Sequence, residues 1–107
     1  MQITVDATGP GAVDVVVEGE LDIATSPRLR GVTEEALREG ARHLVLDLAR
    51  VSFIDSTGVG ALVAIRKLAI EHEAALTLRD PSQPARRILE LSTLVEVFTV
   101  ETSGPPA

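Results

Sequence analysis

The segment LVLDLARVSFIDSTGVGALV, residues 44–63, decides how this chain folds. Residues 43–48, HLVLDL, predict a buried strand, and residues 51–54 continue it in extended form. A helix follows and runs to about residue 72. The strand therefore delivers three small polar residues, Asp55, Ser56 and Thr57, to the start of a helix.

This strand-to-helix junction is where the sequence places its chemistry. A helix N-terminus presents unpaired N–H groups and the positive end of the helix dipole, so it tolerates a phosphate on Ser56. Asp55 or Ser56 can instead serve simply as the N-cap. Gly58 and Gly60 each cost about 1 kcal/mol of helix propensity. They indicate either that another surface approaches the helix here or that the helix packs tightly on the sheet.

Strands and helices alternate outward from this junction. Residues 2–7 and 12–18 predict two strands that form an antiparallel hairpin around a turn at 8–11. The other predicted elements follow in chain order: a helix that begins at Thr25, Ser26 and Pro27 and ends at Gly40, a strand over 75–79, a short helix capped by Ser82 with Ala85, Ile88, Leu89 and Leu91 on its buried side, and an edge strand over 95–100.

This order of elements predicts an α/β fold with a mixed β-sheet. The N-terminal hairpin is antiparallel, whereas each crossover through a helix brings the next strand in parallel. We expect the helices to pack mainly on one face of the sheet. The length of 107 residues fits one domain, which we expect over 1–101, followed by a disordered tail over 102–107 that is rich in proline and glycine.

Composition excludes several classes of function. Ten Lys and Arg residues against 16 Asp and Glu residues give a net charge of −6, which disfavours nucleic acid and anionic membrane surfaces as partners. The chain has no cysteine, so disulfides, thiolate nucleophiles and cysteine-ligated metals are excluded. It shows neither a leader pattern nor an apolar run of membrane-spanning length. We therefore expect a soluble, cytoplasmic domain with no cofactor and no metal.

Two alternative sites arise from the residues. Gly58 and Gly60 after a strand, with Asp80 about 22 residues further on, match part of a dinucleotide-binding fingerprint. Val63 stands at the third glycine position, and the chain has no room for a substrate domain, so a small nucleotide-binding enzyme is the weaker interpretation. Four aspartates at or near strand ends, Asp22, Asp47, Asp55 and Asp80, also raise the alternative of a metal site.

Three segments resemble the STAS domain family and, within it, the bacterial anti-sigma factor antagonists. GELDIATSPRLR (19–30) is similar to the family's segment at the start of its first helix, and LVLDLARVSFIDSTGVGALV (44–63) is similar to its central motif. PSQPARRILELSTLVEVFTV (81–100) resembles its last helix and strand. The resemblance implies the STAS fold.

The resemblance also implies a binding switch without catalysis of its own. Family members bind a serine-kinase anti-sigma factor, which frees the sigma factor. That kinase uses ATP to phosphorylate the serine of the central motif, here Ser56, which ends binding, and a PP2C-type phosphatase restores it. Alternative roles within the family are subunits of a stressosome or of an ABC lipid-transport complex. Partner contacts carry over to Glu20, Asp22, Asp55, Ser56, Thr57, Gly58 and Val59.

The chain departs from the family pattern at two helix ends. Thr25 is followed by Arg28 where the family often has Glu, so the reciprocal capping box is absent. Thr93 stands where the last helix of the family usually ends in Gly, and Thr is poorly suited to the left-handed conformation of that position. Neither departure touches Ser56.

Overall fold

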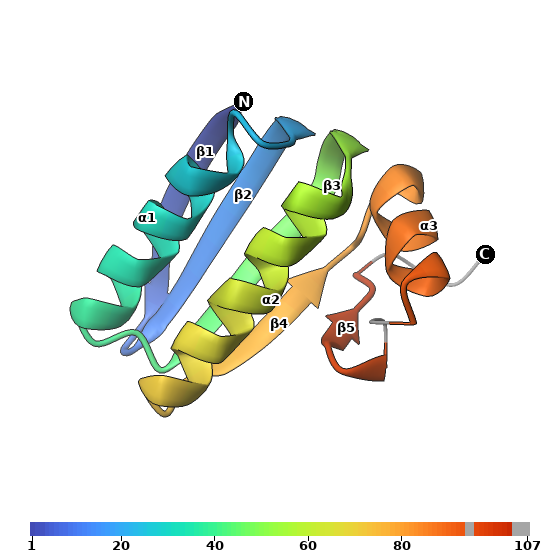
Figure 1. Cartoon of the computed structure of the whole chain (residues 1–107). Helices are drawn as coiled ribbons and strands as arrows, with labels where there is room; N and C mark the ends of the chain where they lie inside the picture. The colour runs from blue at the N-terminus through green and yellow to red at the C-terminus, as the bar shows by residue number, and fades with distance from the viewer. Residues whose placement is uncertain (94–95, 104–107) are drawn as a thin grey trace.

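The computed structural model describes residues 1–93 and 96–103. In these two ranges, strands and helices alternate after an initial strand pair (Figure 1). The elements are β1 (Gln2–Gly9), β2 (Ala12–Leu21), α1 (Ser26–Arg38), β3 (His43–Ile54), α2 (Ser56–Glu71), β4 (Ala75–Arg79), α3 (Gln83–Leu91) and β5 (Thr99–Glu101).

The sheet confirms the predicted mixed α/β fold. Its strand order is β1-β2-β3-β4-β5, and only the β1–β2 pair is antiparallel among the described strands. Helices α1 and α2 lie side by side on one face of the sheet, and α3 contacts β3 and α2 near its far edge (Figure 1). Each parallel pair needs its crossover, which explains why helices separate β2, β3, β4 and β5.

The core lies between the sheet and the helices. Every second residue of the central strands faces α1 and α2, because side chains alternate along a strand. Full burial of each such aliphatic side chain contributes roughly 1.5–3 kcal/mol. Among the fully buried aliphatic residues are Val15, Val17, Leu21, Leu29, Leu37, Leu44, Leu46, Leu48, Leu62, Ile65 and Leu78.

The alternation of buried residues shifts in the second half of β3, before the strand reaches α2. The buried positions change from Leu48 to Val51 and Ile54, so the strict spacing of two is lost. The pairing of β2 with β3 is irregular over the same stretch, between Val16 and Glu18 and again between Gly19 and Glu20. Such bulges redirect side chains near functional sites. Here they keep Ile54 in the core immediately before α2.

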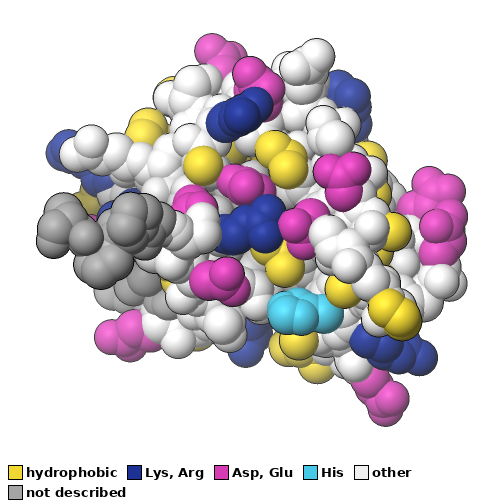
Figure 2. All heavy atoms as spheres, turned by 180° about the vertical axis from the view of Figure 1, so that it is seen from behind, with side chains coloured by type: hydrophobic (Ala, Val, Ile, Leu, Met, Phe, Trp, Pro, Cys, Tyr) yellow, Lys and Arg dark blue, Asp and Glu magenta, His cyan; other side chains and the backbone are white. Residues whose placement is uncertain are grey.

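Among the described residues the helices lie on one side of the sheet (Figure 1), and its opposite face carries charged side chains (Figure 2). Acidic and basic groups lie side by side near its centre, with a histidine beside them. Arg79 of β4 donates to Asp14 of β2 at 3.0 Å and to Asp47 of β3 at 3.3 Å. Because these groups are roughly four-fifths buried, the two ion pairs link three strands in a partly desolvated setting.

Several predicted boundaries and one predicted burial differ from the structure: β1 extends to Gly9, beyond the predicted 2–7, and α1 ends at Arg38 before Gly40. β2 runs on to Leu21 because its end pairs with the end of β3. The last strand is shorter than the predicted 95–100: it covers Thr99–Glu101, and residue 95 lies outside the described residues. The predicted burial of Leu91 is wrong, since this side chain is 75% exposed. Residues two apart lie on different sides of a helix, so Leu91 cannot share the buried side of Leu89.

The described parts of the chain include no helix with the length and apolar character that crossing a membrane requires. Most of the predicted tail, residues 104–107, lies outside the described residues.

Candidate functional site

Asp55 is the N-cap of α2. Its backbone is extended, with φ −116° and ψ −172°, and its carboxylate accepts a hydrogen bond from the Gly58 amide at 3.0 Å. Its carbonyl accepts the first backbone bond of the helix, from the Val59 amide, at 3.0 Å. Of the two N-cap alternatives in the sequence, Asp55 therefore holds the position. The Ser56 hydroxyl is not needed to cap the helix.

Ser56 and Thr57 are the first two residues of α2, and both are exposed. They lie at the positive end of the helix dipole, where backbone N–H groups lack partners within the helix. A negative charge on either hydroxyl is electrostatically favoured at this place. Gly58 and Val59, which follow, are buried. The first turn of α2 thus presents two hydroxyls outward and packs its next two residues inward.

The two glycines of α2 have different roles. A Cβ on Gly58 would lie 2.5 Å from the Leu21 carbonyl oxygen and 2.8 Å from Cγ1 of Ile54, so this glycine permits tight packing of the helix on the sheet. A Cβ on Gly60 would meet nothing within 4 Å, and Gly60 is exposed. Gly58 therefore fits the interpretation that the helix packs tightly on the sheet, and Gly60 fits the interpretation that another surface approaches the helix. Gly60 leaves the outer surface of the first turns free of side-chain bulk.

The end of β2 lies beside this junction. Glu20 pairs with Phe53 and Leu21 pairs with Ile54 in the parallel register. The Leu21 carbonyl also accepts a hydrogen bond from the Asp55 amide at 3.4 Å. Residues 19–22 and residues 55–58 are thus brought together at the carboxyl ends of β2 and β3.

Side chains of the loop between β2 and α1 hold its shape. The Thr25 hydroxyl donates to the Glu20 carbonyl at 2.7 Å and accepts from the Asp22 amide at 2.9 Å. The Asp22 carboxylate accepts from the amides of Ala24, at 3.0 Å, and Thr25, at 3.2 Å. Thr25 therefore folds the loop and makes no capping bond to α1, in agreement with the missing capping box.

The junction is acidic, and it carries exposed apolar groups that sequence patterns missed. Glu20 is exposed, and Asp22 and Asp55 are half-buried. Ile23 is 74% exposed and Phe53 is 48% exposed in the same two segments. A sequence pattern assigns such residues to the core by default, so only the structure shows them at the surface. The isolated position of Ile23 in a polar loop was the one available signal.

The alternative sites find little support in this geometry. Among the described residues, no group of three His, Asp or Glu side chains is placed to hold a metal ion. Asp47 pairs with Arg79. The carboxylate of Asp80 accepts hydrogen bonds from the hydroxyl and the amide of Ser103, and these bonds hold the Asp80 pKa below its usual range. The dinucleotide alternative lacks the third glycine of its fingerprint, because Val63 stands at that position in α2.

Comparison with known proteins decides the family. A family model described as the STAS domain matches residues 4–104. The chain belongs to the STAS domain family. A relative from Paenibacillus polymyxa named anti-sigma F factor antagonist is 32% identical over 91 residues, which cover 84% of this chain and 78% of that protein. The anti-sigma-B factor antagonist of Staphylococcus aureus is 32% identical over 87 residues, which cover 81% of each chain.

Solved structures show the same fold. The anti-sigma factor antagonist SpoIIAA in its unphosphorylated form superposes with a TM-score of 0.79 at 23% identity, covering 95% of this STAS domain and 90% of that chain. The phosphorylated form of SpoIIAA from Bacillus gives a TM-score of 0.74 at 23% identity, covering 95% and 93%. The resemblance inferred from three segments of the sequence is confirmed for family and fold.

Proposed function

We propose that this STAS domain is an anti-sigma factor antagonist that switches by phosphorylation on Ser56. In the unphosphorylated state it binds a serine-kinase anti-sigma factor and thereby releases the sigma factor. Phosphorylation by that kinase ends binding, and a PP2C-type phosphatase restores it. The observation that carries the proposal is the exposed Ser56 hydroxyl at the first residue of a helix that Asp55 already caps. The names of two curated relatives support the same function.

The partner-binding surface in this proposal is formed by the loop after β2 and the first turn of α2. Glu20, Asp22 and Asp55 give it a negative charge, and Thr57 lies beside Ser56. We add Ile23 and Phe53 to the predicted contacts, since exposed apolar side chains beside polar ones are typical of protein interfaces. Gly58 and Val59 support this surface from beneath. Its partner should present an apolar patch to Ile23 and Phe53.

Repulsion at the interface, rather than unfolding, explains release in this proposal. A phosphoserine adds roughly −1.5 to −2 charges at pH 7. The helix dipole and the free N–H groups of α2 stabilise that charge, so the fold is retained. None of the ion pairs among the described residues involves Glu20, Asp22 or Asp55. Phosphorylation therefore concentrates negative charge on a docking surface that is already acidic, and desolvating it against a partner becomes costly.

Phosphate mapping tests the acceptor. The intact domain is incubated with candidate anti-sigma kinases and ATP, and the modified residue is located by mass spectrometry. We expect one phosphate, on Ser56, and none in the Ser56→Ala variant. Modification of Thr57 or of the exposed Ser52 in place of Ser56 would show that the acceptor is wrong. Circular dichroism of the phosphorylated domain should be unchanged, and a loss of helical signal would contradict release by repulsion.

Binding measurements test the switch separately. We expect Ser56→Ala to bind the anti-sigma factor as the parent does, whereas Ser56→Asp binds at least about ten-fold more weakly, because buried like charge opposes association. Gln83→Glu is the matched control: Gln83 is exposed and is the first residue of α3, so the variant adds one negative charge at a different helix start. Equal weakening by both acidic variants would reduce the effect to net charge and overturn the site.

A further inference from the structure

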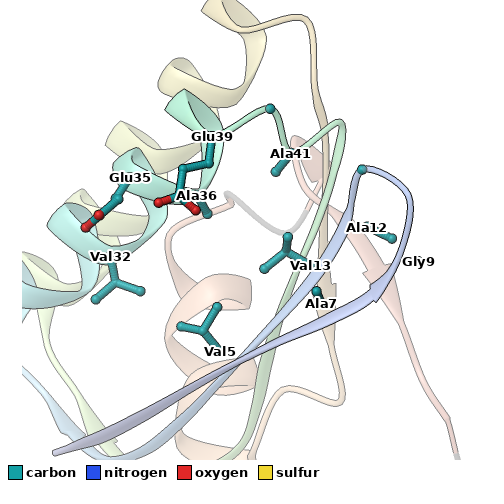
Figure 3. A pocket seen from close by; sticks show the side chains of 12 residues that line it. Val5, Ala7, Gly9, Ala12, Val13, Val32, Glu35, Ala36, Glu39 and Ala41 are labelled. Atoms are coloured by element: carbon teal, nitrogen blue, oxygen red, sulfur yellow. The ribbon is translucent and has the colours of Figure 1, made fainter.

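A cavity of about 480 Å³ lies between α1 and the β1–β2 hairpin. Val5 of β1 and Val32 of α1 point toward each other across it (Figure 3). Val5 is 49% exposed although it lies on the side of the sheet that the helices cover. The other apolar side chains of the lining are Ala7, Ala12, Val13, Ala36 and Ala41. The cavity is therefore an apolar cleft that opens at the β1 edge of the sheet.

Small residues keep this cleft empty. Gly9, Gly11 and Gly40 line it together with four alanines, so no long side chain fills the space between helix and hairpin. Gly11, with φ +72°, and Gly40, with φ +104°, adopt the left-handed backbone that turns the chain sharply at this end. The cleft therefore depends on the glycines at these two turns as well as on the packing of α1.

Acidic groups border the cleft. Glu35 of α1 and Glu39, the C-cap residue of that helix, lie beside it (Figure 3), and both are exposed. Neither is part of an ion pair among the described residues. Exposed Asp6 of β1 pairs with Asp14 of β2, and both side chains lie on the face of the sheet away from the helices. At the start of β1 the gap is closed, because the guanidinium of Arg28 donates to the Met1 carbonyl at 2.8 Å.

β1 also presents an open backbone edge. It is the outermost strand, and within the described residues it pairs only with β2. Proteins usually protect such edges with proline, lysine or a covering segment. The eight residues of β1, QITVDATG, contain neither proline nor lysine. An apolar cleft, a row of acidic side chains and eight residues of free strand edge therefore coincide at one place.

We propose that this edge binds an extended, basic segment of a partner protein by strand addition to β1. Alternate side chains of an added strand point to opposite faces. Aliphatic side chains on one face would enter the cleft between Val5 and Val32, and a basic side chain on that face would meet Glu35 or Glu39. Basic side chains on the other face would meet Asp6. The partner is recognised by backbone pairing, apolar contacts and positive charge together.

Charge argues against a second copy of this chain as the occupant. Two β1 strands paired with each other would bring Asp6 of both copies to the same interface, and each copy carries a net charge of −6. Like charges opposite each other on neighbouring strands are destabilising. A basic segment meets the same residues favourably. The acidic border of the cleft therefore selects a different chain.

This proposed site is independent of Ser56. Val5, at the cleft, pairs with Val15 of β2, and Leu21 at the acceptor junction lies six residues further along that strand, roughly 20 Å away. Both surfaces can be occupied at once. A failure of strand addition would leave the proposed phosphorylation switch untouched, and the reverse also holds.

A synthetic hexapeptide tests the site directly. The probe is acetyl-Lys-Val-Lys-Val-Lys-Lys-amide, titrated into the isotope-labelled full chain while amide NMR shifts are followed. We expect saturable shifts in β1 and in residues 32–41, and binding at least about ten-fold weaker for the same peptide with Glu in place of Lys. Peptides that are N-methylated on alternate residues distinguish strand addition from side-chain docking, since methylation of the paired edge removes its donors. One methylated set should lose binding while the other retains it.

Variants of the chain locate the interaction. Glu35→Lys combined with Glu39→Lys should weaken peptide binding at least about ten-fold. Glu90→Lys combined with Glu101→Lys makes the same charge change at exposed positions on α3 and β5 and should weaken it less than about two-fold. Val5→Lys places a cation in the cleft and should abolish binding. Ser56→Asp should bind the peptide as the parent does.

Three results would overturn the proposal. The first is equal binding of the basic and acidic peptides, and the second is equal binding of the unmethylated and both methylated peptides. The third is a dimer of the chain alone by sedimentation, with β1 amides protected from hydrogen exchange, which would show that a second copy covers the edge.

Discussion

The starts of α1 and α2 are neighbours at one edge of the sheet, and each helix begins with a serine, yet the two serines have opposite environments. Ser26 is 3% exposed, and its hydroxyl has no hydrogen-bond partner in the part of the chain that the structure describes. Ser56 is exposed. Thr25, before Ser26, has a helical backbone and uses its hydroxyl to fold the preceding loop, whereas Asp55 is extended and caps α2.

The difference teaches how a helix start can offer a hydroxyl to another protein. The first turn of a helix needs acceptors for its free N–H groups, and a serine in the capping position would use its own oxygen for that purpose. At α2 the two roles are divided, since Asp55 supplies the acceptor and Ser56 remains available. At α1 neither residue caps, and the serine is enclosed by packing. The two serines hold the same first helical position, so the residue before each serine and the packing around it separate them.

Gly58→Ala should have the largest effect on this comparison, because Gly58 joins the two helix starts. Its Cβ would lie 2.5 Å from the Leu21 carbonyl, which belongs to the segment leading to α1. Backbone must then move, and overpacking of this kind costs about 3 kcal/mol, against about 1 kcal/mol gained in helix propensity. We expect a net loss of about 2 kcal/mol in the free energy of unfolding, measured by urea denaturation.

Gly60→Ala is the matched control for that substitution. It changes the same residue type two positions further along the same helix, but its Cβ meets nothing within 4 Å. Helix propensity then acts alone, so stability should rise by up to about 1 kcal/mol. If both variants lost stability equally, the close approach of α2 to Leu21 would not be the reason for Gly58.

Asp55→Ala should have the next largest effect, because it makes the start of α2 resemble that of α1. Removing the carboxylate that accepts from the Gly58 amide should lower the free energy of unfolding by about 1 kcal/mol. Asp55→Asn keeps an acceptor oxygen and should lose only a few tenths of a kcal/mol, through the helix dipole. Thermal and urea unfolding of the three proteins measure both steps. Equal losses for Ala and Asn would assign the effect to charge and contradict the capping role.

Much of the fold could be predicted because its signals are local. The strand predicted over 75–79 is β4, and the predicted cap Ser82 accepts from the Ala85 amide at 3.3 Å. Thr93 is an exception, because it adopts the left-handed backbone, with φ +54°, although its residue type is poorly suited to that conformation. Alternation, caps and helix ends depend on a few neighbouring residues, so sequence patterns can specify them.

The features that could not be predicted depend on tertiary spacing. Asp55 and Ser56 are both good capping residues, and only the extended backbone of Asp55 decides between them. The exposure of Phe53 depends on the irregular pairing of β2 with β3, which shifts the alternation near the end of the strand. The cleft beside Val5 depends on how far α1 lies from the hairpin, and no local pattern encodes that distance.

Ser26→Ala and Ser56→Ala, measured together, should give the smallest effects and the sharpest test of the difference between the buried and the exposed serine. The buried Ser26 hydroxyl has lost its hydration and has no described partner, so its removal should stabilise the domain by about 0.5–1 kcal/mol. The exposed Ser56 hydroxyl is hydrated in the free domain, so its removal should change stability by less than about 0.5 kcal/mol. Urea unfolding of both variants in parallel measures the difference. A loss of stability in Ser26→Ala would mean that its hydroxyl has a partner in solution, and the two serines would then differ in exposure alone.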